Sequence, residues 1–393
     1  MTDTGNSTTA DPVEHQAHSG ERAQGSSFRT ETLVDFGAAI LEAAGVPGPD
    51  AEYIADTLVT ADGWGHPSHG LLRLSWYVER IRSGVMNPVT DSEVILDGGA
   101  VLVLDGHDGV GQIVTRTACD LAVDRAKAHG VGVVAVRNSN HFGTAAYFTR
   151  SMAQSGCVAI LTTNGSPAMA PWGGRVKTVG ANPWSVAVPG TPEATLGPVV
   201  LDLANTTVAR GKVYAAKERG HRIPEGWAID VDGAPTTDPQ AAIDGIILPM
   251  AGHKGYAISF MMDILSGVLT GSSHSTAIAG PYVPDQRSGC GHLVIAILVD
   301  ALRPSEDFAR DLNDLIAVTK GVPLAAGVEQ VYYPGEIEDR KTRSAETEGI
   351  VLPAKTIEGL LELAQSCGVD ATPIASRSYD VNAAGTDPAA RQD

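Results

Sequence analysis

The sequence contains no apolar run of the roughly 20 residues that a membrane-spanning helix needs. It also begins without the basic stretch and apolar segment of a signal peptide. Basic residues are scarce, since 28 Lys and Arg face 46 Asp and Glu and leave a net charge of -18. Because binding to nucleic acid or to an anionic membrane depends on clustered cations, we expect neither as a partner, and we expect a cytoplasmic protein.

Cysteine is also sparse. The four cysteines are far apart and none has the C-x-x-C spacing of a zinc site or redox pair: Cys119, Cys157, Cys290 and Cys367. We expect them to be reduced and structural. The chain likewise lacks the G-x-S-x-G and H-E-x-x-H signatures of common hydrolases. We therefore expect no resident metal ion and no hydrolase.

Large apolar residues are rare at both ends of the chain. Residues 1–27 are rich in Ser, Thr, Gly and acidic side chains, and residues 376–393 are similarly small and polar. Such segments bury too little apolar surface to offset the entropy of ordering. We expect a disordered extension at the N-terminus and a loose tail at the C-terminus.

Hydrophobic periodicity predicts an α/β protein. Apolar residues recur at helical spacing in segments 31–44, 51–61, 71–81, 113–129, 144–152, 254–269, 307–319 and 356–365. Short apolar runs between turns predict strands at 101–104, 131–136, 158–161, 184–188, 199–203 and 293–299. Gly106, Gly109 and Gly111 separate a strand from a helix, but they do not form the G-x-G-x-x-G order. The sequence therefore does not predict a Rossmann fold.

A cluster of polar residues, Arg137 to His141, follows the strand predicted at 131–136. In α/β folds, ligands bind where strands open into loops. A histidine at such a place can exchange a proton with a hydroxyl or ketone near neutral pH, as alcohol oxidation requires. The residues alone leave two interpretations equally open. His141 is either a catalytic residue or a histidine that is simply packed beside a helix cap.

A second polar loop spans 62–70, and the helix after it carries Arg73 and Tyr77 on one face. A guanidinium holds a carboxylate in a two-pronged geometry, so Arg73 is a candidate anchor for an organic acid. The alternative is a surface ion pair with Glu79. His66 and His69 have a spacing compatible with a shared metal ion, but no third ligand is near them in sequence.

A third loop, residues 249–255, is rich in small residues and leads into a predicted helix. Small residues at a helix start let backbone N–H groups approach a phosphate, and Lys254 adds a positive charge. Glycine-rich turns are more often only turns, so both interpretations of this loop stay open.

Eight short blocks, spread over about residues 31–369, carry a family resemblance. They are Ser68-His69-Gly70 with Arg73 and Tyr77, Ser139-Asn140-His141-Phe142-Gly143, Gly180-Ala181-Asn182-Pro183, Asp202-Leu203-Ala204-Asn205, Arg210-Gly211-Lys212-Val213, Gly226-Trp227-Ala228-Ile229-Asp230, His253-Lys254-Gly255-Tyr256 and Tyr333-Pro334-Gly335-Glu336. Together, and in this order, they resemble the type-2 malate/L-lactate dehydrogenases, a family that includes ureidoglycolate, sulfolactate and diketogulonate dehydrogenases.

The resemblance implies an oxidoreductase that transfers a hydride between NAD or NADP and a small 2-hydroxy or 2-oxo acid. It implies that His141 exchanges the proton, that Ser68 and Arg73 hold the substrate, and that His69 lines the same pocket. Asp202 would share in the acid–base chemistry. The implied cofactor-binding residues are Asn164, Gly165, Asp202, Leu203, Ala204, Asn205, His253, Lys254 and Gly255. Departures from the commoner pattern at Ala181 and Asn205-Thr206 leave the choice between NAD and NADP open.

The resemblance also implies a non-Rossmann α/β fold of the sulfolactate/malate dehydrogenase type. Residues 28–130 would form an N-terminal helical part that holds the substrate, and residues 131–300 a sheet-rich cofactor-binding domain. Residues 301–375 would form C-terminal helices that pack on the N-terminal part. Because family members form dimers whose active sites draw on both subunits, we expect a homodimer.

Two other functions stay open. A relative that reduces an imino acid with NAD(P)H needs the same hydride geometry, but a charged iminium needs less proton donation from His141. A catalytically silent binding protein would be marked by the loss of His141 or Arg73, and the sequence keeps both.

Overall fold

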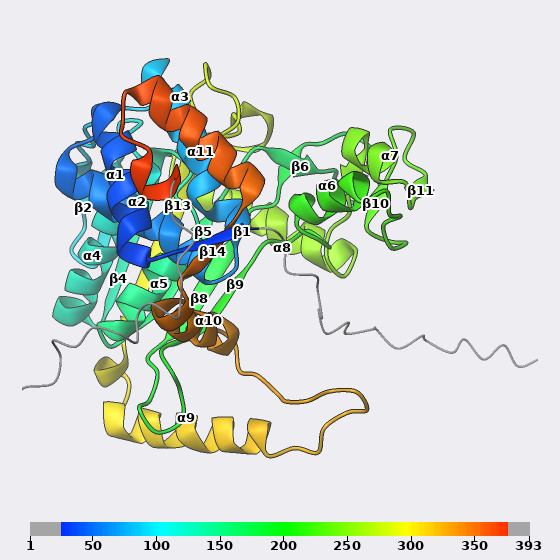
Figure 1. Cartoon of the computed structure of the whole chain (residues 1–393). Helices are drawn as coiled ribbons and strands as arrows, with labels where there is room; N and C mark the ends of the chain where they lie inside the picture. The colour runs from blue at the N-terminus through cyan, green and yellow to red at the C-terminus, as the bar shows by residue number, and fades with distance from the viewer. Residues whose placement is uncertain (1–24, 376–393) are drawn as a thin grey trace, which may run out of the picture.

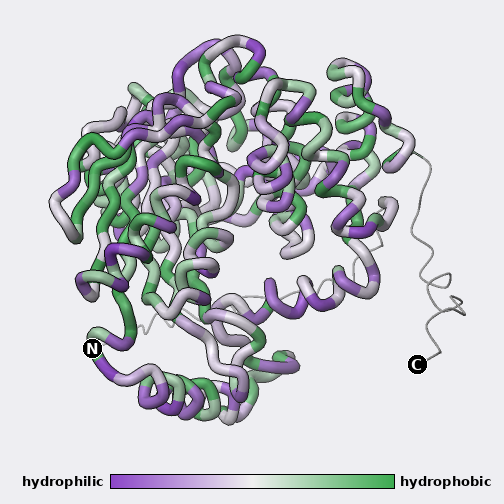
Figure 2. Tube along the Cα trace, turned by 90° about the vertical axis from the view of Figure 1, so that its left-hand side faces the viewer, coloured by the Kyte–Doolittle hydropathy of each residue, from purple (hydrophilic) through white to green (hydrophobic). Residues whose placement is uncertain are grey.

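A seven-stranded mixed sheet forms the centre of the computed structural model, which describes residues 25–375 (Figure 1). The strand order is β2-β3-β4-β13-β5-β8-β9, with β3 and β4 parallel and all other neighbours antiparallel. The strands are β2 Glu93–Asp97, β3 Val101–Asp105, β4 Val131–Ser139, β5 Cys157–Thr163, β8 Trp184–Val188, β9 Val199–Leu203 and β13 Cys290–Leu298. The six predicted strands are all present, and Figure 2 shows hydrophobic residues concentrated in the sheet.

Helices cover both faces of this sheet. α4 (Gly111–His129) and α5 (Ala145–Gln154) pack together on the face to which Ala159 and Leu161 of β5 point. Successive side chains of a strand point to opposite faces, so Thr162 points the other way. There its hydroxyl bonds Ser266 at 2.8 Å, in the π-helical turn η3 (Ile264–Val268) that continues α8 (His253–Asp263).

Helices from the two ends of the chain pack together beside the sheet. α11 (Ala354–Cys367) contacts α1 (Thr30–Ala43) and α3 (Leu74–Arg82), and α10 (Glu336–Glu348) contacts α2 (Gly48–Gly63). The short helix α12 (Thr372–Ala375) also packs on α1. One apolar core therefore joins segments more than 250 residues apart in sequence.

The N-terminal strand corrects one expectation. β1 (Gly25–Phe28) pairs with β14 (Ile350–Pro353), so residues 25–27 are a strand and not part of a disordered extension. Backbone pairing gives this polar segment a partner that its composition did not reveal. The rest of the expected extension, residues 1–24, and the expected tail, 376–393, lie outside the described residues.

Two further features differ from the expected domain scheme. β2, β3 and α4 precede residue 131 yet belong to the central sheet and its cover, so the sheet extends across that boundary. The helix α9 (Ser305–Lys320) does not join the other C-terminal helices in Figure 1. It packs instead through Leu312 and Ile316 against Tyr333.

A small module projects from the sheet between β9 and α8 (Figure 1). It contains α6 (Arg210–Glu218), β10 (Ala228–Ile229), β11 (Pro235–Thr236), α7 (Pro239–Asp244) and β12 (Ile246–Ile247). Its own apolar core is formed by Val208, Val213, Ile223, Ala228, Ala242 and Ile247. Two-stranded β6 (Pro167–Met169) and β7 (Val179–Gly180) lie beside it, and β12 contacts β6. In the described residues no helix is long and apolar enough to cross a membrane.

Candidate active site

Residues from the N-terminal helices, the central sheet and the small module line one cavity of about 670 Å³. Its wall includes residues of the 66–76 loop, the turn after β4, the ends of β5 and β9, and the module that carries α6 and α7. Small-molecule and cofactor sites are clefts of roughly 300–1,000 Å³ with mainly apolar walls and a few convergent polar groups. The cavity is therefore large enough for a dinucleotide cofactor and a small acid together.

The turn after β4 brings His141 into this cavity. Asn140 is fully buried, and its amide donates to the carbonyls of Asp108 and Gly109 at 3.0 and 2.9 Å. The start of α4 lies directly against the turn, because a Cβ on Gly111 would come within 2.4 Å of the carbonyl oxygens of Asn140 and His141. A glycine is required at this contact, and the turn is held rigidly between two elements.

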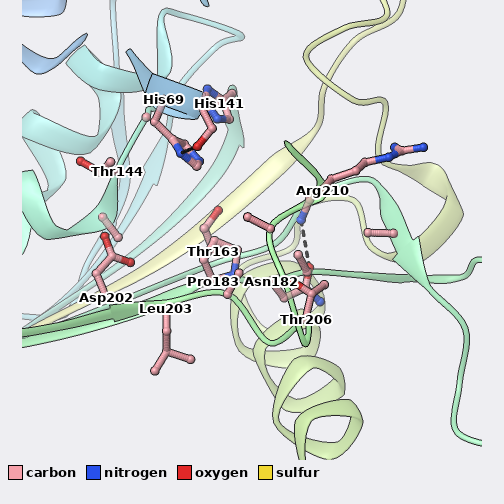
Figure 3. A pocket seen from close by; sticks show the side chains of 18 of the residues that line it. His69, His141, Thr144, Thr163, Asn182, Pro183, Asp202, Leu203, Thr206 and Arg210 are labelled. Carbon is pink, nitrogen blue, oxygen red and sulfur yellow. Dashed lines mark hydrogen bonds between the residues drawn. The ribbon is translucent and has the colours of Figure 1, made fainter. Parts of the chain in front are cut away.

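His141 has a defined partner on one side of its ring. The Tyr77 hydroxyl lies 2.8 Å from Nδ1 of His141, and the ring of His69 stacks on the other side with centroids 5.8 Å apart (Figure 3). Burial lowers the pKa of His141, and the electrostatic effects of the neighbouring His69 and Arg73 lower it further. His141 is therefore neutral at pH 7, a state in which it can accept a proton from a hydroxyl.

The loop of residues 62–73 supplies a positively charged side chain, Arg73, to the cavity. Arg73 is half-buried, its Nε donates to the carbonyl of Ser68 at 2.5 Å, and its guanidinium stacks 3.6 Å from the centroid of Trp76. Burial lowers the pKa of Arg73 to about 10, so the side chain stays protonated at neutral pH. Among the residues that the structure describes, no carboxylate lies within salt-bridge distance of Arg73, which leaves out the alternative pair with Glu79.

His66 and His69 do not share a ligand. Nε2 of His66 lies 3.2 Å from Glu338, whereas Nδ1 of His69 lies 3.0 Å from the hydroxyl of Ser68. Burial lowers the pKa of His69 to about 4, so this ring is also neutral. Within residues 25–375, no group of three potential ligands is placed to hold a metal ion.

Asp202 lies at the end of β9, on another side of the cavity from the two histidines (Figure 3). Its Oδ2 accepts the backbone N–H of Ala146 at 2.7 Å, at the start of α5. The carboxyl group is open to the cavity but crowded by protein on its other sides. This burial raises the pKa of Asp202 to about 6, against the opposing effect of the N–H bond.

The expected cofactor-binding residues separate into two groups. Asn164, Gly165, Asp202, Leu203 and Ala204 line the cavity. Asn205 is buried behind its wall, where the amide donates to the carbonyls of Ala181 and Asn182 and accepts from Trp184. The block of His253, Lys254 and Gly255 starts α8 and does not line this cavity, and His253 and Lys254 are exposed.

Several lining residues were not singled out from the sequence. They are Trp76, Arg150, Lys177, Arg210, Tyr282 and Glu338. Arg210 belongs to one of the eight blocks, but the block had no chemical role attached to it. The others lie outside any recognisable motif, and only the folding of distant loops onto one cavity brings them together.

Comparison with known proteins identifies the family of the chain. Residues 28–361 match the malate/L-lactate dehydrogenase family. The L-sulfolactate dehydrogenase of Methanocaldococcus jannaschii is 38% identical over 331 residues, which cover 84% of this chain and 94% of that protein. Its solved structure superposes with a TM-score of 0.83 at 36% identity, covering 88% of this chain and 98% of that one.

Two further relatives differ in the cofactor that they are named for. The ureidoglycolate dehydrogenase (NAD(+)) of Escherichia coli K12 is 35% identical over 78% of this chain and 87% of its own length. The (2R)-3-sulfolactate dehydrogenase (NADP(+)) of Chromohalobacter salexigens is 39% identical over 68% of this chain and 78% of its own length. With a family match that spans most of its length, the chain belongs to the malate/L-lactate dehydrogenase family of NAD(P)-dependent 2-hydroxy acid dehydrogenases.

Proposed function

We propose that His141 and Arg73 together carry the reaction of this dehydrogenase on a small 2-hydroxy or 2-oxo acid. The observation that supports this most directly is the half-buried guanidinium of Arg73, which has no carboxylate partner among the described residues and shares its cavity with a neutral histidine. A buried cation without a carboxylate partner is costly unless a ligand completes it. A substrate carboxylate is the natural complement of a guanidinium.

The residues around the cavity fit a nicotinamide dinucleotide. Gly165 faces open space, since a Cβ there would meet no atom within 4 Å, and the carboxyl group of Asp202 can accept hydrogen bonds from sugar hydroxyls. Asn164, Leu203 and Ala204 would complete this part of the wall. When bound, the nicotinamide would accept or supply the hydride.

The protein residues then handle the proton and the orientation. Arg73 holds the carboxylate, with Ser68 and His69 beside it, and His141 takes the proton from the substrate hydroxyl or returns it to a ketone. Tyr77 holds Nδ1 of His141 at 2.8 Å, which leaves Nε2 available to the cavity. The mainly apolar wall excludes water and so strengthens these polar contacts. Asp202 would accept hydrogen bonds from the sugar hydroxyls of the cofactor and would share in the acid–base chemistry.

We further propose that the protein works as a homodimer in which α8 faces the second subunit. Large apolar side chains on α8 and the turn after it are about half exposed or more: Phe260, Met261, Val268 and Leu269. Several large apolar side chains exposed on one segment are typical of a protein–protein contact surface. Lys254 on the same helix would then serve the cavity of the partner.

A substrate screen at the absorbance band of reduced nicotinamide tests the function. The panel contains malate, lactate, sulfolactate and ureidoglycolate with NAD and NADP, and their oxo forms and a cyclic imino acid with NADH and NADPH. Turnover of a hydroxy or oxo acid supports the proposal. Turnover of the cyclic imine alone favours the imino-acid reductase alternative, and no absorbance change with any pair contradicts both.

A further inference from the structure

Two basic side chains line the cavity on the side of the small module. Lys177 lies in the loop between β6 and β7, and Arg210 is the first residue of α6. In the described part of the chain, neither makes an ion pair within 4.0 Å. Asp244 favours the charged form of Lys177, but it does not line the cavity, and its Oδ2 accepts a hydrogen bond from Gln240 at 2.8 Å.

The two cations repel each other. Burial lowers the pKa of Lys177, and the charge of Arg210 lowers it further. Lys177 is half-buried and Arg210 is exposed, and an anion between the two would offset the repulsion of these neighbouring cations. Figure 3 shows Arg210 on a different side of the cavity from Asp202, so that carboxylate is not the missing anion.

The backbone beside Arg210 adds to the same site. Ala209, Arg210 and Gly211 all line the cavity, and the nine-residue helix α6 begins there without a side-chain cap. Its first N–H groups and the positive end of its dipole therefore face the same space as the two side chains. A Cβ on Gly211 would meet no atom within 4 Å, so this approach is open.

We propose that Lys177, Arg210 and the start of α6 bind a phosphate group of the nicotinamide dinucleotide. This inference rests on the proposed function, which identifies the ligand as a nicotinamide dinucleotide. It adds the residues that bind the negative charge of that dinucleotide. The phosphate is either part of the pyrophosphate, which NAD and NADP share, or the 2′-phosphate that NADP alone carries. Apolar residues of α7 and β12 in the same cavity, Ala242, Ile243 and Ile247, offer a surface for the attached nucleoside.

Direct titration of NADH and NADPH, followed by cofactor fluorescence, tests this site without turnover. The variants are Lys177→Met, Arg210→Met and Arg210→Lys, with Lys212→Met as the matched control. Lys212 is exposed, lies two residues from Arg210 and does not line the cavity. Each Met variant at the site should weaken binding by roughly 10-fold or more, the effect of losing a charge-assisted hydrogen bond. Arg210→Lys should retain part of the affinity.

The two cofactors distinguish the two phosphates. Weaker binding of NADPH alone assigns the site to the 2′-phosphate, and equal weakening of NADH and NADPH assigns it to the pyrophosphate. If both Met variants bind both cofactors as the Lys212→Met control does, the site is wrong while the dehydrogenase function stands. If the native protein binds neither cofactor, the proposed function fails and this assignment fails with it. Because Lys177 and Arg210 lie on separate segments, misfolding of one variant leaves the other decisive.

Discussion

His141 differs from the neighbouring histidines in what its ring nitrogens contact. Both nitrogens of His292 are bonded, to the hydroxyls of Thr163 and Ser139 at 2.8 Å each, so this ring has a purely structural role. His141 uses Nδ1 for Tyr77, and its Nε2 has no hydrogen-bond partner within the described residues. Nε2 of His69 likewise has no partner in this part of the chain, so His69 is the residue against which His141 must be tested.

His141→Ala should lower kcat by roughly 10² to 10⁴, the range for a positioned acid–base group, because no other group would exchange the substrate proton. Cofactor affinity, measured by fluorescence titration, should stay within a factor of about two. His69→Ala is the control and should lower kcat less. A His141→Ala enzyme with near-native kcat at pH 7 would transfer the role to His69 or Asp202.

Arg73→Lys keeps the positive charge but loses the two-pronged geometry and the stacking on Trp76. We expect kcat/KM for a hydroxy acid to fall by roughly 10- to 150-fold, equivalent to about 1.5 to 3 kcal/mol. An analogue with an amide in place of the carboxylate provides the comparison. The native enzyme should discriminate strongly against this amide, and the variant should discriminate less. Identical discrimination by both enzymes would mean that the carboxylate is held elsewhere.

At the residue scale, the sequence pointed to site residues that either follow a predicted strand or belong to one of the eight family blocks. Ser68, His69, Arg73, His141 and Asp202 all line the cavity. Tyr282 and Glu338 could not be predicted, because they reach the cavity from a turn and from α10, more than 130 residues away from His141 in sequence. Only tertiary packing specifies such contacts.

The loop of residues 62–73 depends on one buried carboxylate. Oδ2 of Asp62 accepts the backbone N–H of Leu71 at 2.8 Å, and a Cβ on Gly70 would come within 2.0 Å of Oδ1. This contact closes the loop into two short 3-10 turns, Pro67–His69 and Leu71–Arg73, which present the substrate-binding side chains. Burial raises the pKa of Asp62 from 3.8 to about 7.

Because the pKa of Asp62 is raised, the stability that this loop contributes depends on pH. The folded state keeps a proton on Asp62 that the unfolded state releases, so the contribution of Asp62 to stability is full below about pH 4 and is lost as the pH rises through about 7. Asp62→Asn keeps the oxygen acceptor but does not titrate. The free energy of unfolding of the native protein minus that of Asp62→Asn, from urea titrations at pH 5 to 8, should therefore decrease by on the order of a few kcal/mol. A difference that is constant with pH would contradict this assignment.

At the element scale, periodicity found the longer elements that carry an apolar stripe or run and missed elements that are short, polar or exposed at the sheet edge. β2 was not predicted because Val94, Ile95 and Leu96 are all exposed at the sheet edge, without the alternation of a half-buried strand. α10 is mainly polar and its buried residues include the ion-paired Glu336 and Asp339, so its pattern lacks an apolar stripe. The strands β10 to β12 have two residues each, too few for a period to be visible.

At the scale of the whole molecule, the position of α8 is the feature that the single chain does not explain. His253-Lys254-Gly255 is one of the eight family blocks, yet it does not line the cavity of its own chain. Glycine at 255 has a local cause, since a Cβ there would come within 2.3 Å of the Met250 carbonyl oxygen. No such packing argument applies to the exposed Lys254. A cyclic dimer, in which each subunit offers the same surface to the other, would give Lys254 a site to act on.

Mixed dimers test whether Lys254 acts on the partner's cavity. Two impaired variants are co-expressed with different tags: His141→Ala, whose kcat we expect to be low, and Lys254→Ala, which we expect to bind the cofactor weakly. The assay uses a cofactor concentration at which Lys254→Ala alone is nearly inactive. If Lys254 serves the partner, the mixed dimer has one intact site, formed by His141 of the Lys254→Ala subunit and Lys254 of the His141→Ala subunit. Random pairing makes about half of the dimers mixed, so the mixture should recover roughly a quarter of native activity.

The pair His141→Ala and Arg73→Ala is the matched control, because both residues line the cavity of one chain and no pairing of subunits restores them together. This control mixture should stay inactive. Size-exclusion chromatography with light scattering, run on the native protein, measures the dimer independently of activity. A dimer whose Lys254→Ala and His141→Ala subunits fail to complement would place Lys254 outside the partner's site, and the lysine would then be an exposed residue at the start of α8. A monomer with full activity would remove the proposed interface altogether.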